Sequence, residues 1–155
     1  MFGLVKFFNK CEAAGIKPIS GASIRVIFEN YENAYELLCL AKTNTGHKNL
    51  MKVISNAHNN TSFKTPIIKF NDLIELKDDI VTISGGKGSH IFEYLKRDNF
   101  KDADAIIEEL RKNFNDDFAL EAQRTNRIDE VDYFNKVLPI SIEKGIPVIA
   151  TNDVL

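Results

Sequence analysis

The residues best suited to chemistry are two carboxylates at the ends of apolar segments. Glu121 lies near the end of one predicted strand, and Asp153 follows another. In a parallel βα barrel the carboxyl ends of the strands meet at one rim, where carboxylates bind metals or act as bases. The structural alternative for Glu121 is an ion pair, with Arg124 or Arg127 as the partner. Two carboxylates without neighbouring histidines do not by themselves indicate an enzyme.

A glycine-rich segment, Gly-Gly-Lys-Gly-Ser at 85–89, follows a predicted strand and precedes a predicted helix. Such a loop can hold a phosphate at the N-terminus of a helix. A Walker sequence, however, places Gly-Lys-Ser/Thr at the end of a longer loop, and the residue order here differs. We therefore interpret 85–89 as a turn at the end of a strand.

The histidines and cysteines do not form a metal or nucleophile motif. His47, His58 and His90 lie one to a segment, in polar contexts where we expect exposed side chains. The chain contains no His-x-His, His-Glu-x-x-His, Cys-x-x-Cys or Gly-x-Ser-x-Gly sequence. Cys11 and Cys39 are too far apart in sequence for a paired-ligand motif, and we expect both to be buried, unpaired apolar residues. The absence of a disulfide framework favours the cytoplasm.

The composition indicates one globular domain over residues 1–155. The chain is 44% hydrophobic and 27% charged, which is typical of globular proteins. Its formal net charge of -2 gives no general attraction to nucleic acid. No apolar run approaches the roughly 18 residues that a membrane span requires. We therefore expect no association with membranes.

Alternating helices and strands are predicted to position the carboxylates. We predict helices over 2–14, 45–57, 70–76, 89–96, 102–114 and 129–144, and strands over 16–28, 36–41, 80–84, 118–123 and 148–151. The helix over 102–114 has the clearest apolar face, and Pro139 should kink or interrupt the last helix. This order favours a mainly parallel sheet with right-handed crossovers. A helix–Gly–Ile–Pro–strand pattern near both ends fits a barrel of repeated βα units.

Five segments, in family order, resemble the PHP (polymerase and histidinol phosphatase) domain of the bacterial DNA polymerase III alpha subunit. They are Gly-Leu-Val-Lys-Phe at 3–7, Ala-Gly-Ile-Lys-Pro-Ile-Ser-Gly at 14–21, Leu-Ala-Lys-Thr-Asn-Thr-Gly-His-Lys-Asn-Leu at 40–50, Leu-Glu at 120–121 and Ala-Thr-Asn-Asp-Val at 150–154. The resemblance implies an α/β fold, a partial PHP-type distorted seven-stranded βα barrel that lacks its first strands. It also implies a fragment without the palm, fingers and clamp-binding region of the polymerase.

Metal-binding members of this family carry a ring of His, Asp, Glu and Cys ligands, and the resemblance places six of these ligand positions in this chain. The positions are Ser23, Glu36, Gly86, Thr125, Asp153 and Leu155. Asp153 alone keeps the family residue, although Glu36 has a carboxylate that could bind a metal. Serine, glycine and leucine do not replace charged or imidazole ligands, and each lost ligand opens the coordination shell. The resemblance therefore implies a vestigial site, with neither a metal nor a catalytic residue.

By the same resemblance, this segment is a non-catalytic scaffold in a DNA-directed DNA polymerase. It would support the polymerase core and bind the proofreading exonuclease subunit, with other holoenzyme subunits and, through the full-length protein, DNA as further partners. No cofactor is expected in these residues: Mg²⁺ belongs to the full polymerase, and Zn²⁺ or Mn²⁺ only to an active PHP site. Two alternatives stay open. One is a metal-dependent phosphoesterase or 3'-5' exonuclease, and the other is an independent small α/β protein.

Overall fold

The chain folds into a six-stranded sheet with helices packed against it. The computed structural model describes residues 3–60, 64–84, 86–125 and 127–152. The described strands, in the spatial order β3-β1-β2-β4-β5-β6, are β1 (Gly21–Ile27), β2 (Tyr35–Ala41), β3 (Ile68–Lys69), β4 (Ile80–Ile83), β5 (Phe118–Gln123) and β6 (Val148–Thr151). The helices are α1 (Leu4–Ala13), α2 (Asn44–Asn59), α3 (Phe70–Ile74), α4 (His90–Lys96), α5 (Phe100–Phe114) and α6 (Ile128–Lys144), with a 3₁₀ turn at Asn115–Asp117. The predicted α/β class is confirmed.

The strand directions are mixed, because β2 runs antiparallel to both β1 and β4. The predicted parallel pairing holds for β4 with β5 and for β5 with β6. Strand β1 is also parallel to β3, a two-residue strand that was not predicted. Residues 28–34 join β1 to β2, and this connection is too short for a crossover between parallel strands. The chain therefore makes a hairpin at this point, which the prediction of a mainly parallel sheet did not include.

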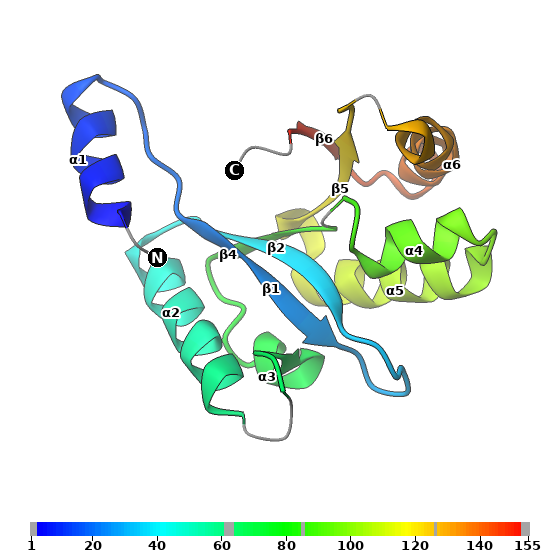
Figure 1. Cartoon of the computed structure of the whole chain (residues 1–155), viewed down its shortest axis with the longest axis horizontal. Coiled ribbons are helices and arrows are strands. Elements are labelled where there is room, and N and C mark those ends of the chain that lie inside the picture. Colours follow the sequence, from blue (N-terminus) through cyan, green and yellow to red (C-terminus); the bar gives the residue numbers. More distant parts are fainter. Residues whose placement is uncertain (1–2, 61–63, 85, 126, 153–155) are drawn as a thin grey trace.

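Helices cover one face of the sheet and build the core there. Figure 1 shows α2 and α3 beside the β1–β2 end of the sheet, and α4, α5 and α6 beside the β5–β6 end. On β1 and β2 the core side chains alternate along each strand, as the period of a strand requires. The predicted apolar face of α5 is confirmed, since every one of its apolar repeat positions is buried. These are Ala103, Ile106, Ile107, Leu110 and Phe114.

Helix α6 shows that Pro139 does not interrupt the helix, and helix α1 lies outside the core. Helix α6 runs without a break through Pro139, which is exposed, while Tyr133 and Val137 anchor the opposite face in the core. Packing of that face compensates for the hydrogen bond that proline cannot make. Helix α1 ends as predicted before Gly15, which takes a positive φ of 67°, but none of its described residues is buried. Its apolar face therefore does not join the core, and α1 stands apart from the other helices in Figure 1.

The cysteines differ in environment. Cys39 is fully buried on β2, as predicted, and burial raises the pKa of its thiol to about 12. Cys11 is only half-buried, because α1 lies outside the core. The prediction of burial was therefore right for Cys39 and wrong for Cys11. No described helix is long and apolar enough to cross a membrane.

Candidate functional site

A buried carboxylate, Glu121, lies where β4, β5 and β6 end. Its side chain is 3% exposed, and one oxygen accepts a hydrogen bond from the backbone N–H of Gly86. The other oxygen accepts from Nε2 of Gln123 at 3.0 Å and from the Thr151 hydroxyl. These three donors are neutral, whereas the structural alternative was an ion pair with an arginine. Several donors to one carboxylate offset the cost of burying its charge, so Glu121 ties β5 to β6 and to the turn at Gly86.

Ser84 and Tyr133 both interact with Glu121. The Ser84 hydroxyl accepts a hydrogen bond of 2.9 Å from the backbone N–H of Glu121, across the β4–β5 pair. Tyr133 of α6 is 3% exposed, and burial raises the pKa of its hydroxyl above the usual value. The hydroxyl therefore stays protonated. Ser84 therefore fixes the backbone at Glu121. Neither Ser84 nor Tyr133 was identified from the sequence, where an isolated serine or tyrosine carries no signal.

Two of the vestigial ligand positions, Ser23 and Glu36, meet across the β1–β2 hairpin. The pairing register sets Arg25 opposite Glu36 and Ser23 opposite Leu38, so these side chains lie on the face opposite the buried Ile24 and Leu37. The Ser23 hydroxyl donates to Oε2 of Glu36 at 3.2 Å, and the backbone N–H of Glu36 donates to the Gly88 carbonyl at 2.9 Å. Both side chains are exposed. Glu36 is thus a solvated carboxylate bonded to a hydroxyl.

The other two described positions, Gly86 and Thr125, are occupied by structural contacts. A Cβ placed on Gly86 would lie 2.7 Å from both Cδ and Oε1 of Gln123, so a side chain at this position needs Gln123 to move. Thr125 donates to Glu130 twice, from its backbone N–H at 2.5 Å and from its hydroxyl. The Thr125 hydroxyl holds the pKa of Glu130 below its usual value. Thr125 therefore stabilises the start of α6.

Asp153 and Leu155, the last two vestigial positions, lie outside the described residues. In the described ranges, no three His, Cys, Asp or Glu side chains gather closely enough to hold a metal ion. The turn prediction for the glycine-rich segment agrees with its described residues. They turn after β4, and the Ser89 hydroxyl caps α4 by accepting from the Phe92 N–H at 3.1 Å.

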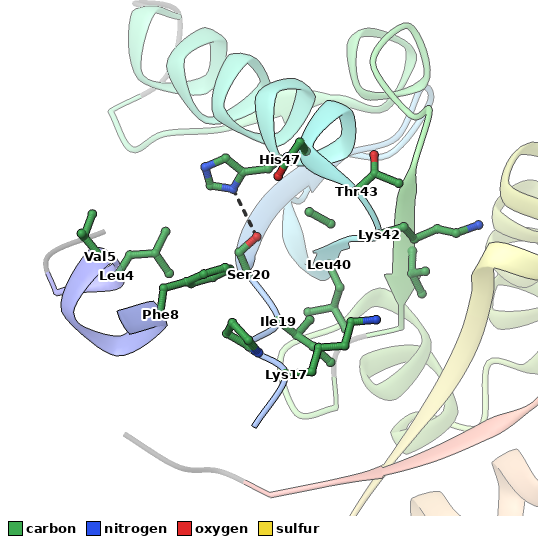
Figure 2. Close-up of a pocket in the computed structure, with 14 residues that line it drawn as sticks. Leu4, Val5, Phe8, Lys17, Ile19, Ser20, Leu40, Lys42, Thr43 and His47 are labelled. Carbon is green, nitrogen blue, oxygen red and sulfur yellow. Dashed lines mark hydrogen bonds between the residues drawn. The ribbon is translucent and has the colours of Figure 1, made fainter. Parts of the chain in front are cut away.

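His90 corrects our expectation of exposed histidines. Its side chain is 4% exposed and packs edge-on against Phe28 and Tyr35, at ring distances of 4.9 and 4.4 Å. Burial lowers the pKa of the imidazole to about 4, and Nε2 has no hydrogen-bond partner among the described residues. His58 is exposed as expected, whereas His47 is half-buried and its Nδ1 lies 3.1 Å from the Ser20 hydroxyl (Figure 2). His90 is buried by aromatic residues that are distant in sequence, so a local sequence pattern could not predict its burial.

The sequence of this chain is similar to those of known proteins. The PHP domain family matches residues 1–125, which is most of the chain. The chain belongs to the PHP domain family. Among its relatives is the DNA polymerase III subunit alpha of Escherichia coli (strain K12), 37% identical over 154 residues, which cover 98% of this chain. The same subunit of Vibrio cholerae serotype O1 is 35% identical over 155 residues, and that of Haemophilus influenzae is 30% identical over 154 residues, each covering 99% of the chain.

This PHP chain spans 13% of the length of each of these three relatives. The sheet with its flanking helices is thus a PHP fold similar to one part of much longer replication proteins. Within it, the described family ligand positions carry a Ser–Glu pair, a glycine against Gln123 and a threonine bonded to Glu130. The donors needed for a polynuclear metal centre do not fit these contacts.

Proposed function

We propose that this PHP chain is a non-catalytic scaffold in the alpha subunit of a bacterial replicative DNA polymerase. In that role it supports the polymerase core and binds the proofreading exonuclease subunit. The likeness to DNA polymerase III alpha subunits along nearly the whole chain supports the assignment to this assembly. The other holoenzyme subunits, DNA held by the full-length protein and a cytoplasmic location belong to the same proposal.

One observation carries the non-catalytic part of the proposal. Of the four described ligand positions, Glu36 alone has a side chain with strong metal-binding capacity, and its carboxylate already accepts from Ser23. A catalytic metal centre needs several protein ligands held by supporting hydrogen bonds, with an open position for water or substrate. These residues do not fit such a centre, so no hydrolytic step is assigned to them. The Mg²⁺ of DNA synthesis would belong to other parts of the full polymerase.

Metal content and hydrolysis of the full-length protein test this part. We expect substoichiometric Zn²⁺ and Mn²⁺ by mass spectrometry, and no EDTA-sensitive release of phosphate from a phosphomonoester or nucleotides from a DNA 3' end. Stoichiometric metal together with EDTA-sensitive hydrolysis would establish the alternative, a PHP phosphoesterase or exonuclease, and reject the scaffold.

Binding of the proofreading subunit is tested separately by size-exclusion chromatography of the full-length alpha subunit with purified exonuclease. We expect one co-migrating complex, and deletion of the PHP region from the alpha subunit should remove it. A complex that persists after that deletion would place the exonuclease elsewhere and contradict the binding role.

A further inference from the structure

Helix α6 exposes an apolar stripe on the side that faces away from the core. Figure 1 shows α6 at the outer edge of the molecule, beside β5. Its inner side is anchored by Tyr133 and Val137, which are 3% and 0% exposed. On the opposite side, exposed apolar residues recur every three or four positions, with one polar residue among them, and so form one line along the helix. They are Ile128, Val131, Leu138 and Ile142, with exposed fractions of 96%, 56%, 36% and 74%.

The outer side of α6 differs from that of a usual surface helix, which carries polar residues there. Helix α5 follows the rule, because its exposed positions include Lys101, Asp104, Glu108, Arg111 and Lys112. Helix α6 instead has apolar residues on both sides, and no charged residue lies at a stripe position. Apolar residues gathered on a surface are typical of a protein interface. The stripe is therefore a surface that another helix would cover.

The residue types in the stripe are those of a two-stranded parallel coiled coil. Such pairs place apolar residues at the a and d positions of a heptad, and isoleucine at a with leucine at d favours two strands. On α6 the a positions are Ile128, Asn135 and Ile142, and the d positions are Val131 and Leu138. A single asparagine at an a position fixes the register and the number of strands in such pairs. Asn135 is exposed and lies between the two apolar ends of the stripe.

The charges that flank the stripe favour pairing with a second copy in the same direction. In a parallel pair, a g residue of one helix faces the e residue of its partner, and opposite charges at these positions attract. Arg127 is at g and Asp132 is at e, so each copy offers one cation and one anion to the other. Both charges also have neighbours within the chain, since Asp132 pairs with Lys136 at 2.7 Å and the Arg127 charge acts on Glu130. The flanking charges therefore set the direction of pairing, whereas the apolar layers supply the affinity.

Helix α6 is already folded before it pairs. An isolated helix of this length, about 25 Å, is marginally stable in water, which limits short coiled coils. Here the packing of Tyr133 and Val137 holds the helix in place, so pairing costs little conformational entropy. Pairing also removes exposed apolar side chains from water, which is favourable.

We propose that the α6 stripe is a self-recognition surface, through which two copies of this chain pair as parallel helices about a two-fold axis. Each stripe residue then faces its own counterpart, as a two-fold interface requires. Val131 and Leu138 form apolar layers with the same residues of the second copy, and the two Asn135 side chains meet between these layers. This surface does not involve the edge of β6 and does not depend on the scaffold role.

Sedimentation velocity of the whole 155-residue chain measures the pairing. Every sample carries Ile149→Lys, because β6 is the last strand of the described sheet and its edge is a second site for association. We expect a dimer with a Kd on the order of 1 μM. In Ile142→Glu we expect at least about tenfold weaker dimerisation, because two like charges meet in one layer.

Val5→Glu is the matched control for Ile142→Glu. Val5 lies on α1 (Figure 2), and Val5 and Ile142 are both 74% exposed, so this change adds the same charge outside the stripe. It should leave the dimer unchanged. Circular dichroism verifies that both variants fold, as the exposure of the two positions leads us to expect.

A disulfide cross-link tests the direction of pairing. Val131→Cys in a chain that carries Cys11→Ser places one accessible thiol in the stripe, while Cys39 stays buried. In the parallel pair the two new thiols lie opposite each other, so mild oxidation should give a dimer on non-reducing electrophoresis. The same substitution at Lys101, an exposed position on α5, should give none.

Four results would overturn the proposal. They are a monomer at all concentrations, a dimer of unchanged affinity in Ile142→Glu, a dimer that Val131→Cys does not cross-link, and equal cross-linking of Lys101→Cys and Val131→Cys. The first result would leave the stripe to a helix of another protein. The third would show that the two helices do not run parallel.

Discussion

At the scale of single residues, the four described positions that the resemblance aligns with family ligands take part in contacts within the chain. Each described position has a partner inside the chain, and Glu121 holds its buried charge with neutral donors. A carboxylate that is fully hydrogen-bonded has little affinity left for a new ligand, because binding would first break those bonds. Glu121 is a residue type often found in active sites, but in this chain it links strands and a turn.

His90 yields a prediction for pH. Its pKa is about 4 in the folded chain against a usual value of 6.5, so the unfolded state binds more protons between these values. Stability should therefore be complete above pH 6.5 and fall as the pH drops toward 4. The loss attributable to His90 is on the order of 3 kcal/mol, from about 1.4 kcal/mol per pKa unit.

Chemical denaturation of the chain at a series of pH values measures this effect. Carboxylates also titrate in this range, so the comparison is with His90→Phe, which keeps an aromatic ring among Phe28 and the tyrosines. We expect a smaller loss of unfolding free energy in His90→Phe than in the unmodified chain, and no such difference for the exposed His58→Gln. Parallel pH profiles for His90→Phe and the unmodified chain would contradict the assignment.

At the scale of elements, the turn after β4 packs so closely against β5 that a Cβ at Gly86 would lie 2.7 Å from Cδ of Gln123. Gly86 donates its N–H to Glu121, and its α-carbon faces the side chain of Gln123, which is itself bonded to Glu121. A side chain at position 86 would therefore require Gln123 to move. The glycine and the glutamine are thus coupled by packing.

A double-mutant cycle tests that coupling. Gly86→Ala should destabilise the chain by roughly 1–3 kcal/mol, because the new methyl group meets Cδ of Gln123. In a chain that already carries Gln123→Ala, the same change should cost much less. Unfolding free energies of the two single variants and the double variant give the interaction energy, which we expect to exceed about 0.5 kcal/mol. Additive costs would show that Gln123 is not the obstacle.

At the scale of the whole molecule, the described sheet has open edges. Strand β6 pairs with β5 on one side, and in the described ranges no strand pairs with its other side. Ile149 is 38% exposed on this strand, with Ala150 exposed beside it. An open edge with apolar side chains is a template for pairing with another chain, and charged residues are the usual protection against this.

We therefore predict that the isolated chain self-associates and that Ile149→Lys reduces this association. Sedimentation velocity over a concentration series should show a growing weight-average mass for the unmodified chain and a nearly constant one for Ile149→Lys. Val5→Ser, which removes an exposed apolar residue of α1 instead, serves as the control and should leave the association unchanged. A monomer with a concentration-independent unfolding transition would contradict the prediction.

Several features followed from the sequence because they depend on neighbours along the chain. The apolar repeat of α5 and the glycine that ends α1 are local patterns, and the structure confirms both. The strand predicted over 36–41 also forms as β2, although its buried residues lie on one face only. The family was recognisable for the same reason, since short segments kept their residues and their order. The ligand positions that the resemblance implies stay a prediction, and four of them lie in the described residues.

Other features were decided by the tertiary structure. The direction of β2, the burial of His90 and the neutral donors around Glu121 all depend on residues far apart in sequence. The half-exposed position of Cys11 belongs here too, because no described residue of α1 is buried. The sequence by itself determined the family, every described α-helix and every described strand longer than the two-residue β3. Only the tertiary structure decided which polar groups are buried and which groups they hydrogen-bond, because those contacts join residues far apart in sequence.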